Sequence, residues 1–314
     1  MMLARVADSL YWIGRYIERA EHRCRLSDVM LTSTLDQNDA AVAVARRAAH
    51  AIDEAQVATD QVSAQDIAHR LVLDDDDRGS VVTALSRARE NARQVRDQIT
   101  SETWERLNML YLRVTSPSAE RALSRGAASF LHGIIADLHL FKGAVDATMS
   151  HGQGWRFLLL GVYLERAQLI ARLLKVCFGD VAGRALLEDH ATQIAVLRMA
   201  CALEPYLRVY TAEVRPRYLL EFLLFDEEFP RSVRFSTQRM EDHLTGLAGP
   251  GGAPGRSRPA RLAARLSARL EFADMDEIFA PSALLSSVAE ECASIHDAIY
   301  ETFVSYPLEQ RLPA

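Results

Sequence analysis

Two glutamate–arginine pairs stand in two copies of one seven-residue sequence. Gly-Arg-Tyr-Ile-Glu-Arg-Ala at residues 14–20 returns as Gly-Val-Tyr-Leu-Glu-Arg-Ala at residues 161–167, with five of the seven residues unchanged. If the two copies pack face to face, Glu18 and Glu165 form a pair of carboxylates, and general acid–base catalysis needs such a pair with pKa values pushed apart. The alternative is that buried glutamate–arginine pairing fixes how the helices pack.

A third group of charged residues follows in Ala-Arg-Glu-Asn-Ala-Arg at residues 88–93. Guanidinium groups bind carboxylates through two parallel hydrogen bonds. A cluster of these arginines and glutamates could therefore hold both charged ends of an amino acid or a short peptide, which would make the protein an enzyme in its own right. The residues of this hypothesis are Glu18, Glu90, Glu165, Arg19, Arg93 and Arg166.

Several kinds of catalytic or cofactor site lack their sequence motifs. A di-iron helical bundle needs Glu-x-x-His on two helices, and the sequence contains no Glu-x-x-His. The four consecutive aspartates at 74–77 lack the alternating spacing of a calcium loop and favour an acidic turn before a helix. Motifs for a phosphate-binding loop or a nucleophilic serine are missing as well. We therefore predict no metal and no cofactor.

The composition indicates a globular protein with an ordinary charge content. Hydrophobic residues make up 49% of the 314 residues, and the net charge of −6 argues against a nucleic-acid partner, which would call for a basic face. The four cysteines stand far apart without Cys-x-x-Cys spacing, which is typical of buried thiols in a reducing compartment. Since no apolar run approaches the ~20 residues that span a bilayer, we predict a cytoplasmic protein with no membrane partner.

Apolar residues recur three and four positions apart around both copies of the repeat, which predicts an amphipathic helix for each. These residues are Leu3, Val6, Leu10, Ile13 and Ile17 around the first copy, and Phe157, Leu160, Leu164, Ala167 and Ala171 around the second. Gly14 and Gly161 lie near the edge of each apolar stripe. A glycine inside a helix costs roughly 1 kcal/mol relative to alanine, and close approach of another backbone would explain why it is kept.

No segment alternates between apolar and polar residues with period two, so we predict an all-α fold, a bundle of about ten helices. The repeat offset of 147 residues is close to half the chain. It indicates a duplication, with halves at about 1–150 and 151–314 packed into one domain over 1–314. One helix is expected from about Ala185 to Tyr210. The glycine- and proline-rich residues 248–260 predict a mobile loop.

An opening motif and four further motifs, in order, resemble the bacterial Alpha-E domain family and cover essentially the whole chain. They are Arg-x-Ala-Asp-x-Leu-Tyr-Trp-x-Gly-Arg-Tyr-x-Glu-Arg-Ala-Glu at 5–21, Ala-Arg-Glu-Asn-Ala-Arg-x-x-Arg at 88–96, Trp-Glu-x-x-Asn at 104–108, Gly-x-x-Leu-Glu-Arg-Ala at 161–167, and Phe-Leu-Leu-Phe-x-x-x-Phe-Pro-Arg-Ser-Val at 222–233. One departure is Arg78-Gly79 before Ser80, where relatives tend to have Asn-Pro.

The resemblance implies an all-helical protein that accompanies, or is fused to, a circularly permuted ATP-grasp protein. Transglutaminase-like proteins and a proteasome-like peptidase are typical genomic neighbours. Our leading hypothesis is therefore a helical partner subunit of an ATP-grasp-type amide ligase, acting in ATP-dependent peptide synthesis or peptide modification. The candidate substrate or partner site consists of Arg15, Glu18, Arg19, Arg89, Glu90, Asn91, Arg93, Tyr163, Glu165, Arg166, Arg231 and Ser232.

Overall fold

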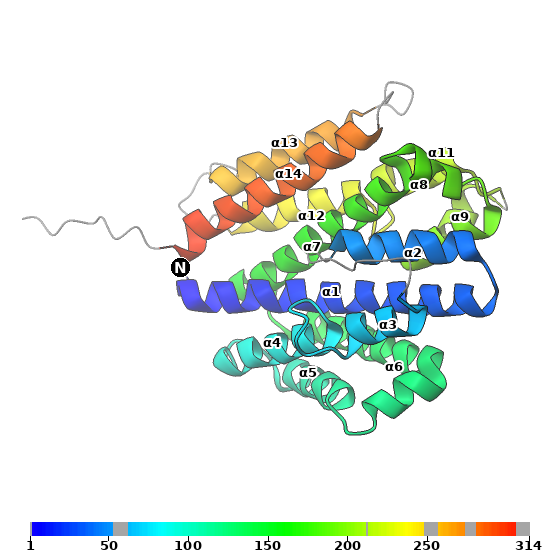
Figure 1. Ribbon diagram of the computed structural model, residues 1–314. Coiled ribbons are helices and arrows are strands. Elements are labelled where there is room, and N and C mark those ends of the chain that lie inside the picture. The colour runs from blue at the N-terminus through cyan, green and yellow to red at the C-terminus, as the bar shows by residue number, and fades with distance from the viewer. Residues whose placement is uncertain (1, 53–61, 212, 248–256, 274–280, 306–314) are drawn as a thin grey trace, which may run out of the picture.

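The computed structural model describes residues 2–52, 62–211, 213–247, 257–273 and 281–305 (Figure 1). These residues form fourteen α-helices and one short π-helix, η1 (Tyr300–Val304), and contain no strand. The predicted all-α fold is confirmed. No helix among them is long and apolar enough to cross a membrane.

The helices divide between the two expected halves of the chain, with residue 150 as the boundary. Those of the first half are α1 (Ala4–Leu35), α2 (Asp39–Ile52), α3 (Ala64–Val72), α4 (Val81–Gln94), α5 (Ser101–Val114) and α6 (Ala119–Thr148). Those of the second half are α7 (Gln153–Phe178), α8 (Val181–Leu186), α9 (His190–Met199), α10 (Leu203–Val209), α11 (Pro216–Phe225), α12 (Val233–Gly246), α13 (Arg258–Glu271) and α14 (Pro281–Ile299).

The expected count of about ten helices is too low, in part because the single helix expected over 185–210 is the end of α8 followed by two separate helices, α9 and α10. The side chain of Asp189 accepts a hydrogen bond from the Thr192 amide and starts α9. Cys201 then adopts a left-handed backbone conformation with φ of 56°, which a continuous α-helix does not allow, so the chain turns before α10. Neither break involves a glycine or a proline.

The long helices α1 and α7 lie at the centre of the bundle and pack against each other (Figure 1). Helices α4 and α6 flank α1, with α5 between them, while α12 and α14 flank α7, with α13 between them. Ser80 and Ser232 cap the N-termini of α4 and α12 in the same way, each accepting a hydrogen bond from the amide three residues on. A duplication would produce this matching order; the superposition of the two halves stays a prediction.

The last residues of the loop predicted over 248–260, residues 257–260, cap and begin a helix instead. Ser257 caps helix α13, which begins at Arg258 and carries Pro259 in its first turn, where a missing amide proton costs no hydrogen bond. Residues 248–256 of that predicted loop lie outside the described residues.

Candidate functional site

Helices α1 and α7 run in the same direction and touch through their backbones at two glycines. A Cβ atom at Gly14 would lie 2.0 Å from the carbonyl oxygen of Leu158, and one at Gly161 would lie 2.0 Å from that of Tyr11. Leu158 occupies the place of Tyr11 in the repeat, so the two contacts are reciprocal. We call this contact, over residues 11–19 and 158–166, the seam. It explains why glycine occupies both places, as the sequence suggested.

The glutamate–arginine pairs cross the seam. Arg166 donates from Nε and Nη2 to the two carboxylate oxygens of Glu18, both at 2.9 Å. Arg19 donates from Nε to Oε1 of Glu165 at 2.8 Å. Each glutamate is therefore paired with the arginine of the other copy, as in a self-complementary interface between two subunits.

Further cations surround the glutamate of the first copy. Lys142 of α6 donates from Nζ to Glu18 at 2.6 Å, and Arg231, just before α12, donates to it at 3.0 Å. The same two cations also reach Glu21. Glu18 and Glu21 are only 1% and 0% exposed, so this side of the seam is closed to solvent.

Burial alone would raise the pKa of both motif glutamates, but the cations beside them have the larger combined effect. Arg15 and Arg19 lower the pKa of Glu165 to about 2. Arg166, together with Arg231 and Lys142, lowers the pKa of Glu18 further. Both pKa values move in the same direction, so the structure does not provide the separated pair that general acid–base catalysis requires. Both glutamates of the seam are therefore ionised at neutral pH.

Acid should weaken the protein through Glu165. Its pKa is near 4.5 in the unfolded chain and about 2 in the fold, so protonation favours unfolding as the pH falls between these values. Glu165 makes its full contribution to the free energy of unfolding at neutral pH, and this contribution should fall by about 2 kcal/mol by pH 3. Urea unfolding at pH 6 and pH 3 measures the loss, which Glu165→Gln should reduce by that amount. An unchanged pH dependence in the variant would contradict this.

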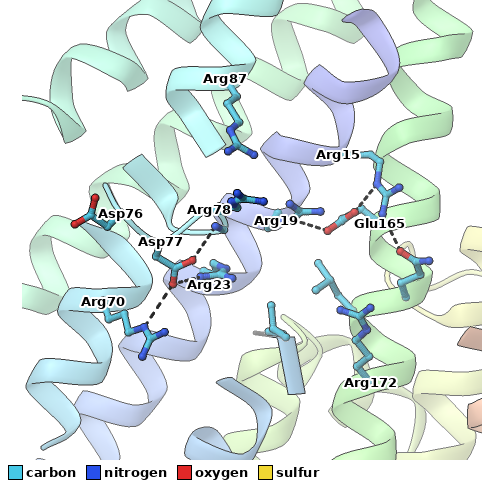
Figure 2. A pocket seen from close by; sticks show the side chains of 14 residues that line it. Arg15, Arg19, Arg23, Arg70, Asp76, Asp77, Arg78, Arg87, Glu165 and Arg172 are labelled. Atoms are coloured by element: carbon cyan, nitrogen blue, oxygen red, sulfur yellow. Dashed lines mark hydrogen bonds and ion pairs between the residues drawn. The ribbon is translucent and has the colours of Figure 1, made fainter. Parts of the chain in front are cut away.

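On the other side of the seam, α1 and α7 border an open cleft of about 610 Å³ (Figure 2). Helix α1 contributes Arg15, Arg19 and Arg23, which follow one another at intervals of four residues on one face. Arg70 comes from α3, Arg87 from α4 and Arg172 from α7. Arg78 comes from the turn before α4. Seven arginines thus face three acidic residues of the lining, Asp76, Asp77 and Glu165. We call this the arginine cleft.

Four of the seven arginines are held by the acids of the cleft. Glu165 accepts from Arg15 at 2.6 Å and from Arg19, while Arg23 and Arg70 lie 3.5 and 3.8 Å from the carboxylate of Asp77. The other three, Arg78, Arg87 and Arg172, form no hydrogen bond or ion pair within the described part of the chain. Their charges are open to an anion.

The structure brings six of the twelve predicted residues together at the seam. Arg15, Arg19 and Glu165 also line the arginine cleft. Glu18, Arg166 and Arg231 are buried in the closed side and do not line it.

The other six predicted residues contact neither Glu18 nor Glu165. Glu90 and Arg93 form an exposed pair with each other along α4. Arg89 of α4 donates to Asn108 and packs over the rings of Trp104 and Tyr111. Asn91 is half-buried on the same helix and does not line the cleft.

Two of these six have clear packing or capping roles. Ser232 is the buried N-cap of α12. Tyr163 stacks on His243 and lies beneath the guanidinium of Arg166. The enzyme hypothesis called for a cluster of three glutamates and three arginines, but only Arg19 and Glu165 of those six line the arginine cleft.

Sequence reasoning missed five cleft arginines, Arg23, Arg70, Arg78, Arg87 and Arg172. Two of them carry a usable signal. Arg23 continues the four-residue spacing of Arg15 and Arg19, and Arg172 stands at the repeat position of Arg25. Arg78 belongs to the one departure from the family pattern, and beside it Gly79 leaves the space that the Arg23 guanidinium fills, with 2.2 Å between a Cβ placed there and Arg23 Nη2.

Comparisons with known proteins agree with this geometry. The Alpha-E family, described as a predicted alpha-helical domain with a conserved ER motif, matches residues 2–304. The crossed Glu18-Arg19 and Glu165-Arg166 pairs fit that description. Uncharacterized proteins of Mycobacterium bovis and Mycobacterium tuberculosis are 28% identical over 326 residues, which cover 94% of this chain and 35% of each relative. The chain thus spans about a third of the length of these curated relatives. No solved structure matches.

Proposed function

The chain belongs to the Alpha-E family, and we propose that it serves a circularly permuted ATP-grasp amide ligase as a helical partner that holds an anionic substrate. The arginine cleft is the observation that carries this proposal. It gathers an excess of four positive charges in a protein whose net charge is −6. Positive charges held this close together repel one another, which costs free energy, and an anionic ligand bound between them would offset that repulsion.

The geometry favours binding over catalysis by this chain. The two carboxylates suited to acid–base work are ionised and held by arginines on both sides of the seam. Bidentate arginine contacts instead suit the recognition of a carboxylate or a phosphate. The alternative, an enzyme in its own right that processes an amino acid or short peptide, would need a proton acceptor in the cleft, and Glu165 is the only seam glutamate that reaches it.

The size of the relatives also supports a partner role. In the mycobacterial proteins a region like this chain is part of a much longer polypeptide, so a helical unit of this kind is joined to other parts. An ATP-dependent ligase works where ATP is abundant, and all four cysteines here are free. We therefore place the proposed activity in the cytoplasm, in peptide synthesis or peptide modification, with transglutaminase-like and proteasome-like proteins as pathway neighbours.

Mixing the purified chain with a permuted ATP-grasp protein from the same genome tests the proposal. We expect co-elution through an interface of at least ~1,000 Å² and ATP-dependent amide formation that needs both proteins. Arg87→Glu should lower that activity roughly tenfold or more without abolishing co-elution, because Arg87 faces the cleft and makes no ion pair in the described chain.

Arg121→Glu is the matched control, since Arg121 is exposed on α6 outside the cleft. No co-elution, with or without ATP and magnesium, would overturn the partner role. Amide formation by this chain alone would favour the enzyme alternative.

A further inference from the structure

We infer that the ligand of the arginine cleft is a short acidic peptide that presents two or more carboxylates to separate walls of the cleft. The inference rests on the proposed function only for the choice of site, since it concerns what the isolated chain binds.

The three open guanidinium groups come from three different elements. Arg78 belongs to the turn before α4, Arg87 to α4 and Arg172 to α7. Figure 2 shows them around the cleft rather than gathered at one point, with Arg87 and Arg172 at opposite ends of the view. One small anion cannot contact all of them, whereas a chain with several carboxylates can give each guanidinium a two-point contact.

The lining of the cleft contains no aromatic ring among the described residues, and its apolar side chains are Ile52 and Leu169. A nucleobase is bound by stacking on aromatic or apolar side chains. The lining offers many charges but no aromatic ring and little apolar surface, so the cleft favours a ligand that is rich in charge over one with a base to bury. A nucleotide or a nucleic acid strand does not fit this description.

Acidic residues at the rim distinguish a peptide from an inorganic polyphosphate. Asp76 is exposed beside the cleft, and its carboxylate lies within 4.8 Å of those of Asp74 and Asp75. This negative edge repels a ligand that carries only negative charges and attracts an ammonium group. A peptide with a free amino terminus and acidic side chains brings both signs of charge.

One arginine of the cleft, Arg15, is held in a fixed position before any ligand binds. Arg15 is 7% exposed and donates to Glu165 and Gln168, at 2.6 and 2.9 Å, so its guanidinium cannot swing away. At about 610 Å³ the cleft lies within the usual range for small-ligand sites, which suits a short peptide.

Isothermal titration calorimetry of this chain alone, without a ligase, tests the inference with three probes: tri-glutamate, tri-glutamine, and tripolyphosphate with and without magnesium. We expect tri-glutamate to bind roughly tenfold or more tightly than either other probe, with affinity that falls as salt rises. Arg87→Gln and Arg172→Gln should each weaken it roughly tenfold. Arg121→Gln should leave binding unchanged, and unfolding curves should show that all three variants are folded.

Equal binding of tri-glutamine, tighter binding of tripolyphosphate, no binding of any probe, or unchanged affinity in both cleft variants would each overturn the inference. A failure of the proposed function can be told apart from a failure of this inference. Tri-glutamate binding without co-elution with the ligase would remove the partner role and leave the inference standing. Co-elution and ligase activity without tri-glutamate binding would remove only the inference.

Discussion

Gly14→Ala should destabilise the protein by about 3 kcal/mol or more. The new methyl group would lie 2.0 Å from the Leu158 carbonyl oxygen and 2.9 Å from the Val162 amide nitrogen, both backbone atoms. A side chain can rotate away from such a clash, but a helix backbone relieves it only by moving as a whole. Overpacking of an interior usually costs ~1–3 kcal/mol, and a backbone contact belongs at or above the top of that range. Urea unfolding measures the change.

Gly143→Ala is the matched control for this prediction. Gly143 also lies inside a long helix, α6, but a Cβ atom there meets nothing within 4 Å. Alanine should therefore stabilise the protein by ~0.5–1 kcal/mol through its better helix propensity. If Gly14→Ala costs less than ~1 kcal/mol, the backbones of α1 and α7 are not in contact as described.

Glu18→Gln should cost about 3–5 kcal/mol in the free energy of unfolding. The amide has nearly the shape of the carboxylate, but it leaves the guanidinium group of Arg166 without a counter-charge in a site that is 1% exposed, and it leaves Arg231 with Glu21 as its acidic partner. Removing one partner of a buried ion pair is costly because the remaining charge has lost its water as well as its partner.

Glu90→Gln provides the comparison, since Glu90 is paired with Arg93 on the exposed face of α4. Its urea midpoint should stay at the wild-type value. If Glu18→Gln unfolds at the same urea concentration as the wild type but loses ligase activity per folded molecule, Glu18 contacts the substrate and does not stabilise the fold.

The sequence allowed the central helices and their glycines to be predicted because both signals are local. An apolar stripe with a period of 3.6 residues and a glycine at its edge need no knowledge of distant residues. The crossing of the charge pairs was not predictable in the same way. Glu18 bonds to Arg166, 148 positions along the chain, only because α1 and α7 run in the same direction with their glycines in contact.

The arginine cleft was harder to foresee because its arginines come from five separate elements. Arg70 and Arg87 come from helices that share no motif with α1, and α1 alone gives no reason to place them near Arg19. The motif at 88–93 was misleading for a related reason. Its charges are regularly spaced along α4, but Glu90 and Arg93 are satisfied by each other on the exposed face, and Arg89 turns toward α5.

The glycine contact between α1 and α7 also fixes the register of the two helices. A slide of one helical turn would bring residues with a Cβ atom into the places of Gly14 and Gly161 and would separate both crossed charge pairs. Since these helices carry four of the seven cleft arginines, the spacing of those charges is set in advance, and a ligand loses little free energy in ordering them. Among the described elements that line the cleft, any opening or closing must therefore come from α2, α3, α4 and the turn between α3 and α4.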